Sequence, residues 1–253
     1  MEKKRLYFID EYRGFWLINM ILYHAIWDIV YIFGCDWQWY KSDMAFFWQQ
    51  SICWSFIFIS GFCWQMGRNK FKNGLQVFGA GIVITLATLI FMPDSRVIFG
   101  VLTLLGSSML LMIPCDVVFQ KINPWLGALL SFILFLFTYP VNDGYLGFGS
   151  AEIIQLPREL YSSWVSTYLG FPKPGFWSTD YFSILPWFFL YAVGYFAYKI
   201  VFMREEKTQI KEIMEKSICS PLGWIGRNSL VIYMLHQPVI YGVLFLWFMF
   251  FNI

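Results

Sequence analysis

Long apolar runs alternate with short polar connectors along the whole chain, and seven of these runs are long enough to cross a bilayer. A hydrocarbon layer of about 30 Å takes roughly 20 helical residues. The runs cover approximately residues 13–33, 44–66, 74–92, 97–119, 124–140, 181–203 and 223–250. Turn-forming residues separate them, as expected of loops at a membrane surface. The pattern therefore predicts an all-α integral membrane protein, a polytopic bundle of about seven transmembrane helices.

The distribution of Lys and Arg predicts the orientation of this bundle, because cytoplasmic loops of membrane proteins are enriched in both residues. With a cytoplasmic N-terminus and seven crossings, the inner ends hold Lys3, Lys4, Arg5, Arg13, Arg68, Lys70, Lys72, Lys121, Lys199, Arg204, Lys207, Lys211, Lys216 and Arg227. The outer ends hold only Lys41, Arg96, Arg158 and Lys173. We therefore expect a multi-pass protein of the cell membrane with its C-terminus outside.

Composition supports the membrane assignment: 58% of the 253 residues are hydrophobic and only 13% are charged. A soluble domain has about 25% charged residues, so the composition excludes a cytosolic globular enzyme and a disordered chain. A net charge of +2 is too small to indicate a nucleic-acid partner. We expect one transmembrane domain over residues 1–253, with an uncleaved first helix and a short amphipathic helix on the cytoplasmic surface at 203–216.

Known metal and phosphate motifs are absent from the sequence. The five cysteines form no C-x-x-C pair and have no histidine at metal-ligand spacing, so we expect no metal site and no disulfide framework. The sequence contains no glycine-rich phosphate loop, H-E-x-x-H or G-x-S-x-G motif. The polar residues inside the predicted helices are therefore the first candidates for chemistry.

The first predicted helix carries three ionisable residues on one stripe. Arg13 and His24 lie about 20° apart in azimuth and about 16 Å apart along the axis, and Asp28 lies one turn beyond His24. An ionisable group inside a bilayer costs at least about 2.5–3.5 kcal/mol, so the stripe should face protein or a wet cavity. A carboxylate can orient an imidazole as a general base or nucleophile, and an arginine can bind an anion.

Simpler explanations exist for the same residues. Arg13 at a helix end is also what positive-inside sorting and snorkelling produce. His24 and Asp28 could each bind a partner on another helix instead of each other. The basic residues Arg68, Lys70 and Lys72 could bind an anionic donor or serve only as a topology signal.

The last predicted helix repeats the pattern in G-R-N-S-L-V-I-Y-M-L-H-Q-P, from Gly226 to Pro238. Ser229, Tyr233 and His236 share one face, and Arg227 lies about 180° from His236. Pro238 should bend the helix and leave a carbonyl acceptor unpaired. This arrangement suggests a cavity at the bend, although an interhelical hydrogen bond that only stabilises the bundle is an equal alternative for His236.

These segments together resemble a known group of proteins. The motif F-I-D-E-Y-R-G with His24 eleven residues after Arg13, S-F-I-F-I-S-G-F at 55–62, D-Y-F-S-I-L-P-W-F at 180–188 and the His236-Gln237-Pro238 end are similar to bacterial membrane proteins grouped with heparan-alpha-glucosaminide N-acetyltransferase. That group is distantly related to the acyltransferase-3 membrane enzymes. The resemblance spans nearly the whole chain.

The resemblance implies transmembrane acyl transfer. Acetyl-CoA or another acyl-CoA would bind on the cytoplasmic side, and the acyl group would pass to a hydroxyl or amine of an extracytoplasmic carbohydrate. In the acyltransferase-3 relatives an arginine and a histidine separated by ten residues in the first helix are essential, and Arg13 and His24 match that spacing. Their implied roles are anion or thioester positioning and general base or acyl acceptor, with Asp28 beside them.

One position departs from the heparan enzymes. There the residue matching His24 is asparagine and the catalytic histidine lies in the following connector, whereas this chain has no histidine between residues 34 and 43. The role of His24 therefore rests on the more distant relatives.

The remaining predictions concern substrates and partners. We expect Arg13, Arg68, Lys72, Arg227 and Asn228 to contact the donor, and Ser229, Tyr233, His236, Gln237 and Asp180 to line the cavity or the acceptor site. The outer connector 141–180 is long enough to be an acceptor-binding or lid element, with Trp164, Tyr168 and Trp177 as candidate sugar contacts. Membrane lipid, acyl-CoA and the carbohydrate are the expected partners, and a homodimer is left open. The alternative function is a small-solute or proton-coupled transporter with His24, Asp28 and His236 as a relay.

Overall fold

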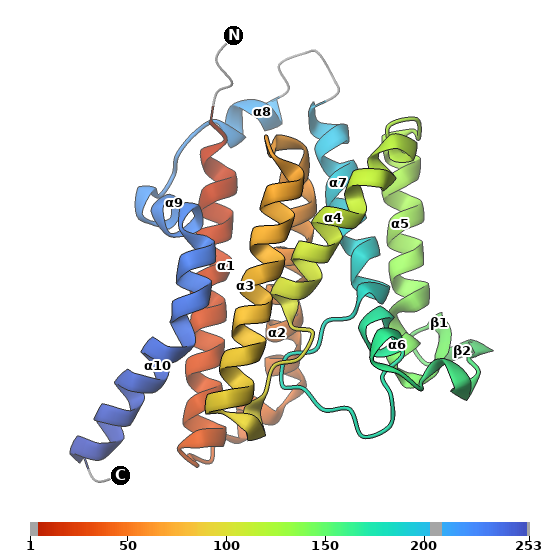
Figure 1. The fold of residues 1–253 in the computed structure, drawn as a ribbon. Coiled ribbons are helices and arrows are strands. Elements are labelled where there is room, and N and C mark those ends of the chain that lie inside the picture. The colour runs from red at the N-terminus through yellow and green to blue at the C-terminus, as the bar shows by residue number, and fades with distance from the viewer. Residues whose placement is uncertain (1–4, 203–208, 252–253) are drawn as a thin grey trace. The chain divides into compact units, whose positions relative to one another are not determined.

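The computed structural model describes residues 5–202 and 209–251. The chain forms two compact units. Unit 1 comprises residues 1–56 and 204–253, and unit 2 comprises residues 57–203. Nearly all regular structure is helical, and most of the helices are long (Figure 1). Because helices satisfy their backbone hydrogen bonds internally, this architecture suits an apolar solvent.

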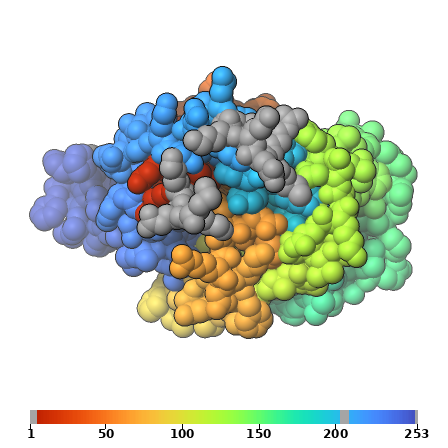
Figure 2. All heavy atoms as spheres, turned by 90° about the horizontal axis from the view of Figure 1, so that it is seen from above, coloured from red at the N-terminus to blue at the C-terminus, as the bar shows by residue number. Residues whose placement is uncertain are grey.

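Unit 1 contains the first and last helices of the chain. Its elements are α1 Tyr7–Trp27, continued by a π-helix at Asp28–Ile32, a 3₁₀ turn at Gln38–Lys41, the first part of α2 Asp43–Cys63, α8 Gln209–Met214, α9 Ser220–Arg227 and α10 Ser229–Phe251. Helix α1 packs against both α9 and α10. The last turns of α10, dark blue, project away from α9 (Figures 1 and 2).

Two glycines permit the close packing of α1 on α9. A Cβ atom on Gly14 would lie 2.0 Å from the carbonyl oxygen of Leu222, and one on Gly226 would lie 1.8 Å from that of Asp10. Only a residue without Cβ fits where backbones approach this closely. The glycines of the R-G and G-R-N motifs are therefore explained by helix packing.

Unit 2 contains the remaining elements. They are the end of α2, 3₁₀ turns at Trp64–Met66, Pro93–Ser95, Tyr139–Asp143 and Arg158–Leu160, the helices α3 Lys70–Phe91, α4 Val101–Phe119, α5 Pro124–Thr138, α6 Trp164–Leu169 and α7 Ile184–Phe202, and the strands β1 Tyr145–Phe148 and β2 Ala151–Gln155. Helix α3 packs on α4 and α5 packs on α7. Gly61 of α2 and Gly194 of α7 repeat the close approach seen in unit 1, facing the carbonyls of Tyr191 and Phe58.

Capping side chains are found at the start of several helices. The Asn69 side chain accepts a hydrogen bond from the Lys72 amide at the start of α3, and Asn123 caps α5 ahead of Pro124. Ser163 and Ser166 form a reciprocal capping box at α6. Each cap satisfies backbone N–H groups that a helix leaves unpaired at its N-terminus.

Six of the described helices are long and apolar enough to cross a membrane: 7–32, 70–91, 101–119, 124–143, 184–202 and 229–251. This confirms an all-α, polytopic membrane protein. Helix α2 coincides with the predicted run 44–66 but is not among the six, because Gln49, Gln50, Ser51 and its tryptophans lower its hydropathy. The orientation inferred from seven crossings stays a prediction.

Three local predictions differ from the structure. The run 223–250 is two helices, because the chain turns at Asn228, where φ is −99° and ψ is 19°. The connector 141–180 contains the antiparallel hairpin β1–β2, with Tyr145 opposite Gln155 and a turn at Gly149, whose φ is +58°. Of the amphipathic helix predicted at 203–216, the structure has α8 at 209–214, and residues 203–208 lie outside the described residues.

Candidate active site

The two histidines of the chain meet in unit 1. His24 on α1 and His236 on α10 have ring centroids 5.0 Å apart, with the ring planes inclined at 52°. The sequence predicted a role for each but did not predict that they touch. Among the described residues, none makes a hydrogen bond to the His24 ring, and the ring of His236 packs against it.

The local geometry of α10 sets the tautomer of His236. Its Nδ1 lies 2.5 Å from the backbone carbonyl oxygen of Tyr233. A carbonyl can only accept, so Nδ1 carries the hydrogen and, in the neutral ring, Nε2 is left with a lone pair. Nε2 is buried and has no hydrogen-bond partner among the described residues. The ring therefore presents a fixed basic nitrogen.

Asp28 lies beside this pair but does not bind His24. The Asp28 carboxylate is fully buried, and its Oδ1 accepts a hydrogen bond of 2.6 Å from Nε2 of Gln237. Of the two arrangements that the sequence left open, the structure has the one in which Asp28 binds a partner on another helix. Asp28 and Gln237 thereby join α1 to α10 next to the histidines.

Three buried polar atoms of this cluster have no partner within the described part of the chain: Nε2 of His236, Oδ2 of Asp28 and Oε1 of Gln237. Buried polar atoms in native proteins nearly always have a partner, and each exception needs an explanation. Acceptor atoms that share one small region are what a site awaiting a donor group, such as a substrate hydroxyl or amine, would contain.

Irregular backbone accompanies the cluster on both helices. Helix α1 changes to π-helical hydrogen bonding at Asp28, where the Phe33 amide donates to the Asp28 carbonyl at 3.0 Å. Such π segments often occur at functional sites. Helix α10 contains Pro238 directly after Gln237, and its course changes along its length (Figure 1). The sequence predicted the proline bend but gave no signal for the π segment.

The other predicted residues of unit 1 lie along the same helices. Arg13 is partly buried on α1, eleven residues before His24. Arg227 is exposed at the end of α9, so its predicted position opposite His236 on one helix was wrong. The Asn228 side chain donates to the Trp224 carbonyl at 2.9 Å and caps α9. Ser229 begins α10, and the Tyr233 ring lies 5.3 Å from that of His236.

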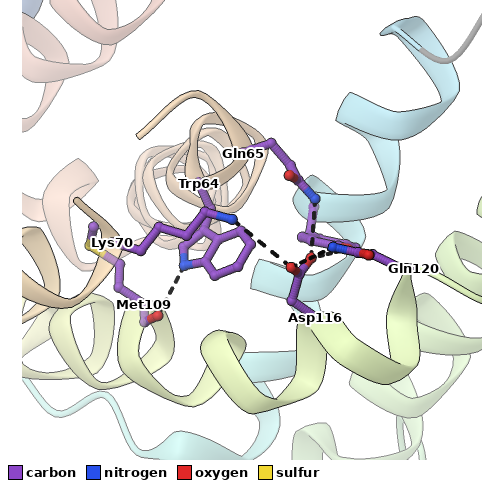
Figure 3. Close-up of polar contacts among 7 residues, drawn as sticks. Trp64, Gln65, Lys70, Met109, Asp116 and Gln120 are labelled. Atoms are coloured by element: carbon purple, nitrogen blue, oxygen red, sulfur yellow. Dashed lines mark hydrogen bonds and ion pairs between the residues drawn. The ribbon is translucent and has the colours of Figure 1, made fainter. Parts of the chain in front are cut away.

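Arg68 and Lys72 belong to unit 2, where both are exposed next to the start of α3. Their neighbour Lys70 behaves differently, since its Nζ lies 4.0 Å from Oδ2 of Asp116 and 3.5 Å from the centre of the Trp64 ring (Figure 3). Lys70 is therefore occupied by an internal cluster, and Arg68 and Lys72 remain as the exposed cations of this loop.

The cluster around Asp116 was not predicted from the sequence. Asp116 accepts hydrogen bonds from Gln120 at 2.7 Å and, more weakly, from Gln65 at 3.4 Å (Figure 3). It also accepts one from the Tyr195 hydroxyl at 2.5 Å. Together these contacts connect α4, α7 and the 3₁₀ turn Trp64–Met66 in unit 2. A carboxylate satisfied on both oxygens in this way stabilises the packing of helices.

Asp180 has a structural contact in unit 2. Its Oδ2 accepts a hydrogen bond of 3.1 Å from the Val101 amide, at the first turn of α4. Burial raises the pKa of the Asp180 carboxyl to about 6. A carboxylate committed to a helix N-terminus is poorly placed to bind a sugar, which favours the packing role for this residue.

The model of the catalytic domain of heparan-alpha-glucosaminide N-acetyltransferase matches residues 5–238. The chain belongs to this family. The match covers both units and ends at Pro238, so it includes Arg13, both histidines and Gln237. No curated protein and no solved structure gives a significant match.

Membership in the heparan-alpha-glucosaminide N-acetyltransferase family makes the chain a multi-pass membrane acetyltransferase. It also agrees with the resemblance read from the motifs. Within the described residues, no three His, Cys, Asp or Glu side chains gather as metal ligands would.

The segment F-I-D-E-Y-R-G contains a buried structural residue, Glu11, whose role the sequence did not indicate. Glu11 is buried, and its Oε1 accepts hydrogen bonds from the Ser217 hydroxyl at 2.6 Å and from the amides of Ile218 and Cys219 at 3.0 Å each. It thereby fixes the chain just before α9. Its spacing within the motif gave no signal, because its partners lie more than 200 positions away.

Replacing Glu11 by alanine should destabilise the protein by about 2–4 kcal/mol, because three donors lose a charged acceptor in a buried place. Thermal unfolding of the detergent-solubilised protein measures the change. Glu11→Gln keeps one acceptor oxygen and should lose clearly less. An alanine variant as stable as the wild type would show that the contacts of Glu11 contribute nothing to folding.

Proposed function

We propose that this protein transfers an acetyl group from cytoplasmic acetyl-CoA to a hydroxyl or amine of an extracytoplasmic glycan. The observation that carries the proposal is the cluster in unit 1, where His236 directs an unpartnered Nε2 into a buried region next to His24 and Asp28. A neutral imidazole with one nitrogen fixed by a carbonyl is the usual form of a general base. The family match supports acetyl transfer as the reaction class.

His236 acts as the general base. The acceptor nitrogen or oxygen attacks the thioester carbonyl, which forms the new C–N or C–O bond, and the C–S bond then breaks. The proton of the acceptor moves to Nε2 of His236 and from there to the departing sulfur, so the enzyme ends unchanged. The buried position of Nε2 excludes water, which protects the thioester from hydrolysis.

His24 acts as a hydrogen-bond donor. A neutral imidazole always has one N–H, and the ring of His24 lies 5.0 Å from that of the base. Donation to the thioester carbonyl oxygen would stabilise the negative charge that develops there. In the heparan enzymes, the resemblance places an asparagine at the position of His24. An asparagine amide also has N–H donors, so this residue fits the role of a donor better than that of a base.

Asp28 and Gln237 position the acceptor. Their hydrogen bond leaves Oδ2 and Oε1 as acceptors beside the histidines. A substrate hydroxyl or amine can donate to either oxygen and be aligned for attack on the carbonyl. Both side chains act through hydrogen bonds and neither exchanges a proton in the reaction.

Basic side chains bind the anionic end of the donor. In unit 1, Arg13 and Arg227 lie on segments that the charge pattern assigns to the cytoplasmic side. Arginine binds phosphates through paired N–H groups. The Asn228 side chain contributes by capping α9, which holds Arg227 at the end of that helix.

Acetyl-CoA turnover by the purified protein in detergent tests the function. We expect thioester cleavage that depends on a glycan acceptor and falls by about 10²–10³-fold in His24→Ala, the usual effect of losing one oxyanion donor. A transporter would show no thioester cleavage in detergent and would need sealed vesicles. Unchanged turnover in His24→Ala would contradict the assignment of this site.

A further inference from the structure

Two pockets adjoin at one end of unit 2 and share the indole of Trp164. The first has a volume of about 330 Å³ and a predominantly apolar lining that includes Phe78 and Ile82 of α3, Phe99, and Val165 of α6. Helix α3 is one of the six membrane-spanning candidates, and Ile82 is 41% exposed on it. This pocket therefore opens among side chains that face hydrocarbon.

The second pocket has a volume of about 350 Å³ and contains two cations, Arg96 and Lys173, together with Trp177. Nε of Arg96 donates to the Trp177 carbonyl at 3.3 Å, and Nζ of Lys173 lies 3.9 Å from the centre of the Trp164 ring. No carboxylate in the described part of the chain lies within ion-pairing distance of either cation. The pocket is therefore positively charged and unneutralised.

The walls of both pockets are held in place by the loop that follows α6. The Phe182 amide donates to the Phe99 carbonyl at 2.8 Å, and the Ile98 amide donates to the Ser178 hydroxyl at 2.9 Å. Phe99 has a φ of +57°, a conformation that costs a non-glycine residue energy and that recurs where function requires a side chain in a fixed direction. Its ring lies 4.9 Å from that of Tyr168.

We infer that this double pocket binds a membrane lipid that carries a phosphate in its headgroup. The phosphate lies between Arg96 and Lys173, and the apolar chain follows Trp164 into the pocket beside α3. Both cations belong to the few that the charge pattern places on the outer side, so the lipid comes from the outer leaflet. A soluble glycan could fill the cationic pocket but has no apolar part for the adjoining one, whereas an amphiphile fills both.

The consequence for the enzyme is a phosphate headgroup held on the side from which the acceptor is expected to approach. The inference does not rest on acetyl transfer, because lipid binding needs neither His24 nor His236. It can therefore hold or fail independently of the proposed function.

Native mass spectrometry of the full-length protein in detergent, titrated with dioleoyl phosphatidylglycerol, tests the headgroup half of the site. We expect Arg96→Gln and Lys173→Gln each to weaken retention of the lipid by about fivefold, the usual contribution of one cation near an anionic lipid. Arg158→Gln is the matched control, since Arg158 is an exposed outer arginine that lines neither pocket. Equal losses in all three variants would overturn the inference.

Two tryptophan variants test the apolar half. Ile82→Trp fills the pocket beside α3 and should abolish lipid retention, whereas Val83→Trp, at the neighbouring position, 54% exposed and outside the lining, should leave it unchanged. Both proteins must elute as monodisperse species for the comparison. If Ile82→Trp left lipid retention unaffected, the placement of the lipid's apolar chain in this pocket would be overturned.

Two further measurements identify the ligand class. Phosphatidylcholine, whose choline offsets the phosphate charge, should be retained more weakly than phosphatidylglycerol, and equal retention would overturn the charge argument. Millimolar glycerol 3-phosphate should not displace the lipid. Displacement by that soluble headgroup would show a site for free phosphate esters and overturn the lipid assignment.

Discussion

His236→Ala should lower the rate of acetyl transfer by about 10²–10⁴-fold, the range for loss of a positioned general base. The physical reason is specific to one atom. Nδ1 of His236 is engaged by the Tyr233 carbonyl, which leaves Nε2 as the basic nitrogen of the site. Initial rates of thioester cleavage with and without an acceptor measure the loss, and thermal unfolding shows that the variant is folded.

Asparagine substitutions separate the roles of the two histidines. His24→Asn should keep most of the activity that His24→Ala loses, because an amide N–H can replace the imidazole N–H as a donor. His236→Asn should be as inactive as His236→Ala, because an amide nitrogen has no basic lone pair. If His236→Asn were active and His24→Asn inactive, the base would be His24 and the roles would be reversed.

The membrane helices could be predicted from sequence because one strong physical rule decides them. Apolar length sets where a span begins and ends, and the predicted runs at 97–119 and 124–140 correspond closely to α4 at 101–119 and α5 at 124–138. Periodicity gives no comparable signal for a short break, so the turn at Asn228 inside the run 223–250 was missed. The hairpin in the connector was missed for the same reason, since strands of four and five residues carry little pattern.

The residues of the site were easier to predict than their contacts. An ionisable side chain within an apolar run is costly, and this rule alone singled out His24, Asp28 and His236. Which of them touch depends on how α1 and α10 cross, and Asp28 binds Gln237 across more than 200 positions. Glu11 and Asp116 were missed because they lie near helix ends, where a charge needs no special explanation until its buried partners are known.

Gly14→Ala should destabilise the protein by about 2–4 kcal/mol or prevent its assembly, even though it adds one methyl group. The added Cβ would lie 2.0 Å from the Leu222 carbonyl oxygen, and a backbone atom cannot move aside as a side chain can. The helices α1 and α9 must therefore separate. Because α10 follows α9 directly, this separation also loosens the position of His236 on α10. Thermal unfolding and size-exclusion chromatography in detergent measure the effect.

Gly242→Ala is the matched control within unit 1, because nothing lies within 4 Å of a Cβ built at that helical glycine. It should leave stability unchanged or raise it by up to about 1 kcal/mol, since alanine favours the helix. Equal losses in the two variants would show that backbone approach is not what selects glycine at position 14.

Gly226→Ala tests whether the two glycines act on one contact. Its Cβ would lie 1.8 Å from the Asp10 carbonyl oxygen, so it forces apart the same pair of helices, α1 and α9. Once either substitution has separated them, the second finds its clash already relieved. The double variant should therefore cost clearly less than the sum of the single variants, which is the coupling expected of residues that share one interface. Additive losses in a double-mutant cycle would mean that each glycine responds to its own local backbone, and that α1 and α9 can separate at one end while staying packed at the other.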